Sequence, residues 1–300
     1  MKHSFKVTWV LLLLFLLIQF IGIAVLQQYV DVSQSTAEEI VFAELPIGER
    51  PPLEENNSYI TIIFAVLLGT GLAFLLMHYH LVWLWKAWFF IAVFTTLLIS
   101  FGAFLPVWLA FILSFVLTTW RLIKPNFFIQ TGTELFVYPG LAAIFVPLFS
   151  LTSISILLVL ISFYDAYAVW KSKHMITLAK SQAKAKIFAG LLVPYAVRKQ
   201  ELVSPRQQKL GKEEKKRKNG KYLIRTAILG GGDVAFPLLF AGVVFKELGL
   251  WQSLIIPLFA ALGLGLLFWK AKEKKFYPAM PFISIGCFVG LLVVWLIGLL

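Results

Sequence analysis

Cysteine is almost absent from this sequence of 300 residues, which contains a single one, Cys287. A lone cysteine cannot form a disulfide within the chain, so a disulfide-held fold is excluded and the cellular compartment is left open. Charged residues are also scarce, at 14% of the chain, whereas hydrophobic residues make up 60%. This composition excludes an ordinary soluble domain and is typical of an integral membrane protein.

Nine apolar stretches approach the length that a membrane-spanning helix needs, about 20 residues. The first, from Val7 to Val30, has no charge over 24 residues. That is too long for the core of a cleaved signal peptide, so we expect it to be retained. We therefore predict an all-α integral membrane protein built as a bundle of nine transmembrane helices. The predicted helices cover residues 7–27, 59–78, 82–100, 103–120, 134–150, 152–170, 222–245, 248–269 and 279–299.

Acidic residues are few, 15 against 27 lysines and arginines, and the basic residues are unevenly distributed. With nine helices and a cytoplasmic N-terminus, 25 of the 27 fall on the inner side, leaving only Arg50 and Lys246 outside. Basic loops stay in the cytoplasm, so this partition predicts the orientation. Three predicted helices end at the inner side of the membrane with a tryptophan followed by a lysine or arginine. We interpret the tryptophan as an interface residue and the basic side chain as one that reaches the lipid headgroups. These pairs are Trp120–Arg121, Trp170–Lys171 and Trp269–Lys270.

One long hydrophilic segment divides the chain. Residues 1–170 are expected to hold six helices, residues 171–221 a basic cytoplasmic loop, and residues 222–300 the last three helices. The end of the loop, GKEEKKRKNGK, resembles a nucleic-acid-binding patch when taken alone. Because it lies beside the membrane, we interpret it as a loop next to anionic lipid headgroups, and no nucleic-acid partner is expected.

Only two acidic residues fall well inside the apolar stretches, Asp165 in ISFYDAYAVW and Asp233 in ILGGGDVAFP. Ionisable groups in a bilayer are rare and usually pair with one another or line a wet cavity. The sixth and seventh predicted helices are antiparallel, so the two carboxyls can meet at similar depth. Adjacent carboxyls share one proton, and such a pair can activate water while polarising a peptide carbonyl. Gly230 and Gly232 leave space for a helix or a substrate backbone beside Asp233.

Three motifs along the chain resemble those of a known family. Tyr164–Asp165 precedes the long loop, Gly230–Gly231–Gly232–Asp233 fits G-x-G-D, and Pro278–Ala279–Met280–Pro281 opens the last predicted helix. In this order, on the sixth, seventh and ninth helices, they resemble the presenilin and signal peptide peptidase family of GxGD intramembrane aspartyl proteases. The third motif has methionine where the family has leucine in Pro-Ala-Leu, an exchange between two long apolar side chains.

The resemblance implies an intramembrane aspartic endopeptidase of the cell membrane that cleaves transmembrane helices of membrane-protein substrates by general acid and base activation of water. It implies Asp165 and Asp233 as the catalytic pair. Seven further residues are implied to support the active site or bind the substrate: Tyr164, Gly230, Gly232, Pro278, Ala279, Met280 and Pro281. A cytoplasmic N-terminus is the presenilin orientation, signal peptide peptidases being inverted, and the compact size resembles an archaeal homologue.

Two alternatives stay open on the residues alone. A prepilin-peptidase-like enzyme also uses a G-x-G-D aspartate, although that would not explain the motif at Pro278. A transporter or channel could use the two acids as a proton or cation relay, although we find no inverted repeat of the kind that transporters show.

No cofactor is expected, and no metal site either. His78 and His80 lie close in sequence, but no nearby Cys, Asp or Glu completes a zinc set. The expected partners are the lipid bilayer and membrane-protein substrates. The sequence leaves open whether the chain forms a homo-oligomer or needs partner subunits.

Overall fold

The computed structural model describes residues 5–35, 40–48, 58–79, 81–124, 126–172, 190–198, 222–271 and 277–298, and every structural statement below refers to these ranges. They form nine α-helices, two short helical turns and two strands. The elements in chain order are α1 (Phe5–Gln28), α2 (Ser58–His78), α3 (Val82–Gly102), α4 (Val107–Ile123), α5 (Phe127–Phe145), the 3-10 turn η1 (Val146–Leu148), α6 (Leu151–Tyr167), the π-helical turn η2 (Ala168–Ser172), β1 (Gly190–Arg198), β2 (Tyr222–Gly230), α8 (Gly231–Leu248), α9 (Leu250–Lys270) and α10 (Met280–Gly298).

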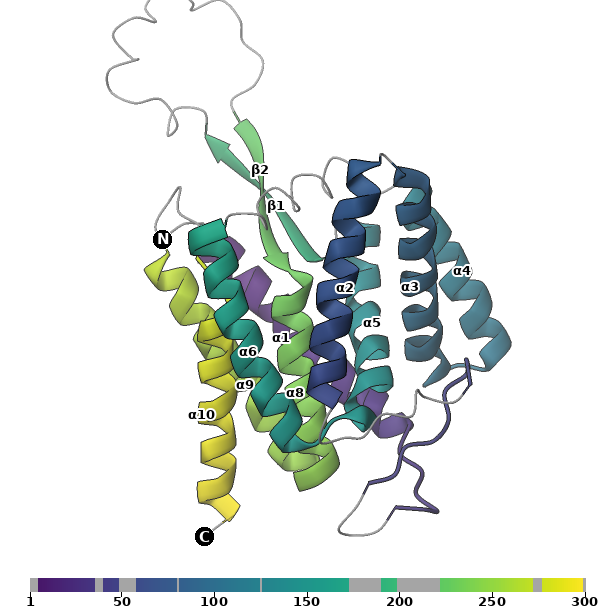
Figure 1. The fold of residues 1–300 in the computed structure, drawn as a ribbon, viewed down its shortest axis with the longest axis vertical. Coiled ribbons are helices and arrows are strands. Elements are labelled where there is room, and N and C mark those ends of the chain that lie inside the picture. The colour runs from purple at the N-terminus through teal and green to yellow at the C-terminus, as the bar shows by residue number, and fades with distance from the viewer. Residues whose placement is uncertain are drawn as a thin grey trace, which may run out of the picture.

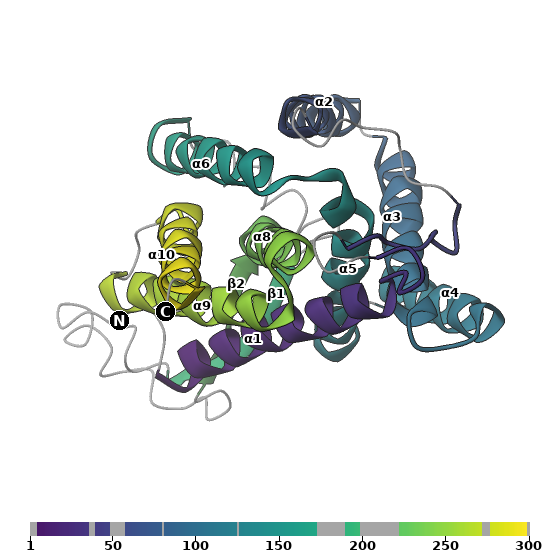
Figure 2. The same cartoon turned by 90° about the horizontal axis from the view of Figure 1, so that it is seen from below.

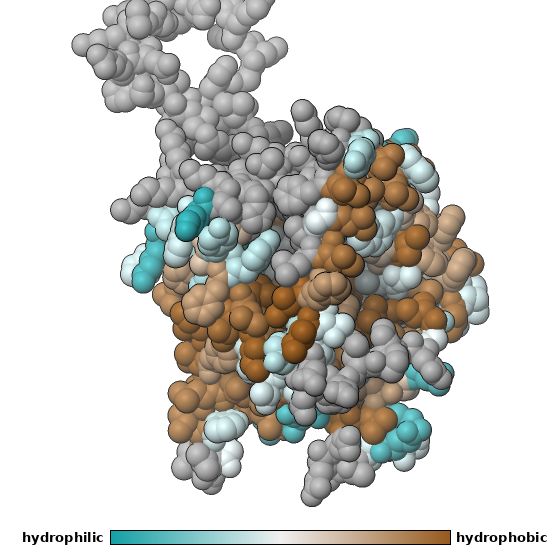
Figure 3. All heavy atoms as spheres, in the orientation of Figure 1, coloured by the Kyte–Doolittle hydropathy of each residue, from teal (hydrophilic) through white to brown (hydrophobic). Residues whose placement is uncertain are grey.

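The prediction of an all-α membrane protein is confirmed. Six helical segments of the described chain are long and apolar enough to cross a bilayer, and α4 is a shorter apolar helix of 17 residues. The surface agrees with this assignment, because many large apolar side chains on these helices are exposed and can be covered only by lipid. In Figure 3, hydrophobic residues cover the middle of the bundle, and hydrophilic ones gather toward its two ends.

Helix α8 lies at the centre of the bundle, in contact with α1, α5, α6, α9 and α10, as the view along the helices in Figure 2 shows. It is buried almost continuously from Pro237 to Phe245, the pattern of a helix surrounded on all sides. The main core is built around it, and a smaller core joins α3 and α4 to α5. Helix α2 stands at the edge, and its main contacts among the described elements are with α3 and α6.

The two ends of the bundle differ. Helix α1 begins and α6 ends at the end where the two strands lie, whereas α10 ends at the opposite side (Figure 1). An odd number of crossings between α1 and α10 agrees with the predicted topology. At the end opposite the strands, the Lys246 ammonium donates to the carbonyls of Pro147 and Phe149, both at 3.3 Å. Glu247 accepts the amide of Leu151 at 2.6 Å, so the end of α8 is tied to the turn between α5 and α6.

The two strands are the main departure from the predicted elements. Residues 222–230, expected to open the seventh helix, form β2, which pairs antiparallel with β1 from within the predicted loop. A helix running through Gly230, Gly231 and Gly232 would lose about 1 kcal/mol at each glycine. Ending the strand at Gly230 and starting α8 at Gly231 places these glycines at the helix start, where the penalty is smaller.

Two other expectations were wrong, and they concern Arg121 and Glu134, which contact each other in the structure. Arg121 was expected to reach the lipid headgroups, but it is 4% exposed and ion-paired with Glu134. Glu134 was placed at the start of its helix, but α5 begins at Phe127, so Glu134 lies in its second turn and is 1% exposed. The side chain of Asn126 accepts the amides of Phe128 and Ile129 and caps α5 there, a start signal that the apolar pattern did not include.

Close packing of α5 on α3 at Gly140 gives a stability prediction. A Cβ atom at this position would overlap the backbone carbonyl of Thr96, which cannot move as a side-chain tip can. We expect Gly140→Ala to destabilise the protein by about 3 kcal/mol, seen as a lower unfolding temperature in detergent. The control is Gly132→Ala on the same helix, where a Cβ atom meets nothing within 4 Å. It should raise the unfolding temperature slightly, because alanine favours helix, and equal behaviour of the two variants would contradict the packing.

Candidate active site

Asp165 lies near the end of α6, in the last turn before the helix widens into the π-helical turn η2. Such local widening is often found at functional sites. Its side chain is 6% exposed, and its Oδ2 atom accepts the backbone amide of Met280 at 3.1 Å. The amide of Ala279 is also directed at this carboxyl. The structure therefore brings the Pro-Ala-Met-Pro motif next to Asp165, the first of the two predicted aspartates.

The start of α10 explains why these amides are available. The first amides of a helix have no partner within it, and the helix dipole favours an anion there. Pro278 and Ala279 precede the helix, which begins at Met280, and the Ala279 carbonyl accepts the amides of Phe282 and Ile283. The predicted start of the last helix at this motif is confirmed. Asp165 thus acts as the acceptor for a helix N-terminus that lies inside the bundle.

Asp233 lies in the first turn of α8, three residues after the N-cap Gly230. The Gly230 amide is directed at its carboxyl, which is one half of the reciprocal capping arrangement found at helix starts. Asp233 was expected well inside a helix, so its placement at a helix start corrects that expectation. Taken as a whole residue, Asp233 is intermediate in exposure, whereas Asp165 is buried.

The two acids belong to helices that pack on each other, α6 and α8, and their carboxyls lie within electrostatic range of one another. Both therefore stand next to the N-terminus of a helix, Asp165 at that of α10 and Asp233 at that of its own helix α8. This arrangement supplies two carboxyls with several fixed hydrogen-bond donors in the interior of a membrane bundle. It can hold a water molecule between an ionised and a protonated carboxyl.

The remaining predicted site residues differ in how closely they contact the two acids. Met280 and Ala279 are buried and present their amides to Asp165, and Pro278 is buried just before them. Pro281 is partly buried in the first turn of α10. Tyr164 is partly buried, and its hydroxyl lies within electrostatic range of the Asp165 carboxyl.

The two glycines beside Asp233 are not equivalent. A Cβ atom added to Gly230 would lie 3.1 Å from Oδ2 of Asp233, whereas one added to Gly232 would meet only the Phe236 ring at 3.5 Å. Gly230 is therefore needed for the approach of the Asp233 carboxyl to the N-cap. Gly232 is exposed, and a side chain there would not reach the Asp233 carboxyl.

Sequence reasoning missed two polar contacts that support the acids. The hydroxyls of Ser162 and Ser284 lie 2.7 Å apart and join α6 to α10 one turn from Asp165 and one turn from Met280. The side-chain amide of Gln19, fully buried in α1, donates to the Val234 carbonyl at 2.9 Å, next to Asp233. A single glutamine in the middle of a long apolar helix is a signal that could have identified Gln19. The serines gave no comparable signal, because hydroxyls in helices commonly bond their own backbone.

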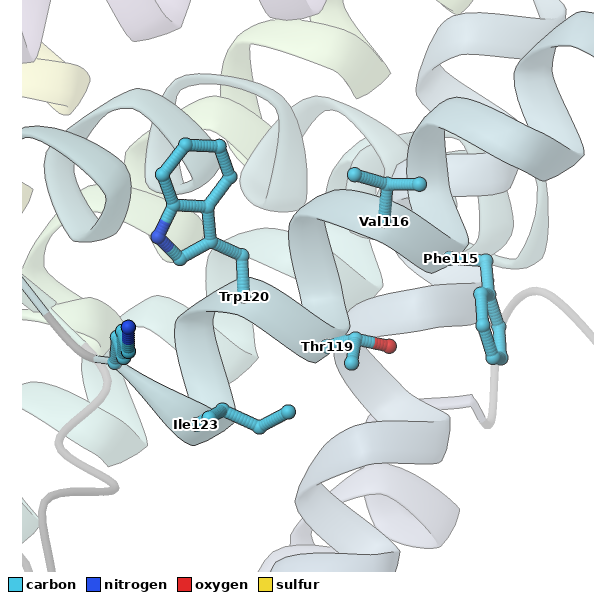
Figure 4. Close-up of a pocket in the computed structure, with 6 residues that line it drawn as sticks. Phe115, Val116, Thr119, Trp120 and Ile123 are labelled. Atoms are coloured by element: carbon cyan, nitrogen blue, oxygen red, sulfur yellow. The ribbon is translucent and has the colours of Figure 1, made fainter.

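Hollows on the outer surface are separate from this site. One of about 320 Å³ on α4 is shown in Figure 4, with an open, apolar lining typical of a lipid-facing helix. Its lining residues are Phe115, Val116, Thr119, Trp120, Ile123 and Lys124. Within the described ranges no three His, Cys, Asp or Glu side chains gather as a metal site would require, and His80 lies outside those ranges.

Comparisons with known proteins bear on the whole chain. A family model described as signal-peptide peptidase, presenilin aspartyl protease matches residues 11–299. A solved structure described as a presenilin family intramembrane aspartate protease, in space group C222, has a TM-score of 0.62 and 16% identity over 97% of this chain and 99% of its own. Another of the same description, in space group P2, has a TM-score of 0.60 and 18% identity over 95% and 96%. A search of curated proteins finds no match.

The different surroundings of the two glycines give a test of the geometry at Asp233. We expect Gly230→Ala to lower stability by about 1 kcal/mol, because it crowds the Asp233 carboxyl and alanine is a poor N-cap. Amide hydrogen exchange in the first turn of α8 should become faster. Gly232→Ala is the matched control and should leave both the unfolding temperature and this exchange unchanged. If Gly232→Ala perturbed the first turn more than Gly230→Ala, the described position of the carboxyl would be wrong.

Proposed function

Because this chain belongs to the signal-peptide peptidase and presenilin family of aspartyl proteases, we propose that Asp165 and Asp233 are the catalytic pair with which it hydrolyses peptide bonds. The protein is a multi-pass intramembrane aspartyl protease, and its substrates are membrane proteins in the bilayer. The observation that supports the assignment of the pair is the approach of two carboxyls from packed helices, each beside a helix N-terminus.

The hydrogen bonds around the two acids suggest different roles. The amides of Ala279 and Met280, at the start of α10, are directed at Asp165, and one amide is directed at Asp233. Donors of this kind favour a carboxylate. We therefore assign Asp165 as the general base, which takes a proton from water as its oxygen bonds to the peptide carbon. Asp233 acts as the general acid and donates a proton to the carbonyl oxygen. Proton transfer to the amide nitrogen then accompanies cleavage of the C–N bond.

A substrate helix must be unwound locally, because a helix hides its peptide bonds within its own hydrogen-bond ladder. Strand β2 runs into Gly230, and among the described elements only β1 pairs with it, which leaves its other edge available. An extended peptide can add to such an edge through backbone hydrogen bonds. We propose that the substrate lies extended between this edge and the non-helical residues Pro278 and Ala279.

One chain supplies both carboxyls and the amides directed at them. If chains associate in the membrane, we propose that each one already contains a complete active site. Measuring cleavage by chains held singly in nanodiscs tests this directly.

The assignment of the pair predicts that each carboxyl is indispensable. Replacing either acid by an amide removes the base or the acid and the partner that shares its proton. We expect Asp165→Asn and Asp233→Asn each to lower kcat for a single-span substrate by at least about 1000-fold. Their unfolding temperatures should stay the same or rise, because a buried acid is removed. Wild-type activity should be bell-shaped against pH, with one carboxyl ionised and one protonated.

The same preparation separates the alternative functions. A proton or cation relay predicts ion flux in vesicles that both variants change, without cleavage by the wild type. Substantial proteolysis by either asparagine variant would refute the assignment of the pair. Ser162→Ala is the control for a substitution near Asp165, and it should retain measurable cleavage.

The proline before α10 gives a further prediction. Proline has no amide and fixes its backbone angle, which stops α10 from extending backward. With Pro278→Ala the helix can gain a turn, and the amides of Ala279 and Met280 would bond within it and no longer reach Asp165. We expect kcat to fall about tenfold with an unchanged unfolding temperature. The matched control is Pro106→Ala, at the exposed N-cap of α4, and an equal response of kcat to both changes would contradict this role.

A further inference from the structure

Few charged side chains of the described residues are buried, and two of them form an ion pair. Among the described residues, the only charged side chains that are buried are Arg121, Glu134 and Asp165. The Arg121 guanidinium donates to Oε1 of Glu134 and, at 2.8 Å, to the Thr133 hydroxyl, and it lies 5.0 Å from the centre of the Phe89 ring. A buried ion pair is weak evidence for stability, because apolar residues of similar volume often stabilise a protein as well or better. The pair therefore points to another role.

The ion pair is connected to the first residue of β1. Oε1 of Glu134, the atom that binds Arg121, also accepts the Gly190 amide at 3.3 Å. Gly190 has a φ angle of 147°, a conformation that side chains rarely adopt. The start of β1 is thus a backbone position held by a charged side chain of α5.

The same face of α5 makes two further contacts with this strand. The Gln130 amide donates to the Gly190 carbonyl at 3.5 Å, and the Thr131 hydroxyl donates to the Leu192 carbonyl at 3.4 Å. The described sheet has only two strands, so one edge of β1 has no strand beside it. Polar side chains of α5 bind backbone groups near the start of β1, which fixes where the strand sits on the bundle.

The position of β1 determines the position of Asp233. In the antiparallel register Gly190 pairs with Gly230, and Gly230 is the N-cap of α8. A Cβ atom on Gly230 would lie 3.1 Å from the Asp233 carboxyl, so a movement of this backbone displaces or releases that carboxyl. A continuous series of contacts therefore leads from Arg121 through Glu134, Gly190 and Gly230 to Asp233.

We propose that the Arg121–Glu134 ion pair positions Asp233 for catalysis by anchoring the start of β1 to α5. Neither residue touches the reacting atoms, so both are positioning residues and not catalytic ones. The inference rests on the proposed function only in taking Asp233 as a catalytic acid. The pair orients the hairpin and the first turn of α8 as one unit, while Met280 orients Asp165 from the other side.

The test separates anchoring from stability. Arg121→Met alone leaves a buried carboxylate without its partner, so the unfolding temperature should fall sharply. The double variant Arg121→Met/Glu134→Leu removes both charges and should recover most of that temperature. Its kcat should nevertheless stay about tenfold or more below wild type, with a smaller change in KM, because the Gly190 amide has lost its acceptor. Hydrogen exchange in residues 222–232 should be faster than in the wild type.

Further variants keep the test decisive. Thr131→Val removes one contact to β1 without changing any charge, and it should lower kcat a few-fold in the wild type but much less in the double variant. Tyr29→Phe is the control, since it removes a 2.8 Å hydrogen bond to the Ile99 carbonyl on other helices of the bundle. Even if Tyr29→Phe lowers the unfolding temperature as far as the double variant does, its kcat should equal that of the wild type. The proposal is overturned if the double variant recovers kcat together with stability, or if exchange in residues 222–232 is unchanged.

Failure of this inference can be distinguished from failure of the proposed function. If Asp165→Asn and Asp233→Asn abolish cleavage while the double variant cleaves like the wild type, only the positioning role is wrong. If the wild type cleaves no substrate, the proposed function fails. The exchange measurement then still reports whether the ion pair anchors the hairpin.

Discussion

Unpaired backbone amides inside a membrane bundle are the constraint on which this structure depends. A helix that starts within the protein leaves its first amides without partners, and in the membrane interior each such group is costly. Helix α10 starts in this way, and the Asp165 carboxyl accepts one of its amides. A carboxyl in the same environment is costly unless donors surround it. The helix N-terminus and the acid therefore satisfy each other, and the proposed catalytic carboxyl of Asp165 is held in place by the requirement for hydrogen bonding.

The β1–β2 pair depends on the same constraint. Non-helical backbone is tolerated at membrane depth only where protein covers it or water reaches it. Strand β1 lies against α1, α5 and α8. Besides pairing with β2, its Gly190 amide donates to the Glu134 carboxyl and its Leu192 carbonyl accepts the Thr131 hydroxyl, both on α5. Extended backbone can thus reach the start of α8, three residues before Asp233. A continuous seventh helix would have left no extended edge beside Asp233.

The sequence predicted the helices well where apolar stretches were long and clearly bounded. Helix α3 was predicted at 82–100 and observed at Val82–Gly102, and the weak break before Leu151 proved to be a turn followed by a capping box at Ser150 and Ser153. The error at 222–230 has a physical reason, since a short apolar run fits a buried strand as well as a helix segment. The three glycines were the available signal, because they are unfavourable inside a helix and acceptable at its start.

The site residues could be predicted from sequence motifs, whereas the residues that hold them in place could be identified only in the fold. Asp165, Asp233 and the residues around Pro278 were recognisable because acids inside apolar segments are rare and the three motifs stand in a set order. Gln19, Ser162 and Ser284 support them through contacts between distant helices. No pattern along the chain contains such pairings, since they depend on how the helices cross.

Arg121 and Glu134 show how a misplaced helix boundary hides a functional candidate. Moving the start of α5 from residue 134 to Phe127 turns Glu134 from an apparent interface residue into a buried one. Of the three buried charged residues in the described chain, Asp165 belongs to the proposed catalytic pair, and Arg121 and Glu134 belong to the series of contacts that reaches Asp233 through β1. Charged residues that only stabilised the fold would have no reason to lie along this series of contacts. Under the two proposals made above, these buried charges serve one site, Asp165 as a catalytic carboxyl and the ion pair as the anchor of β1.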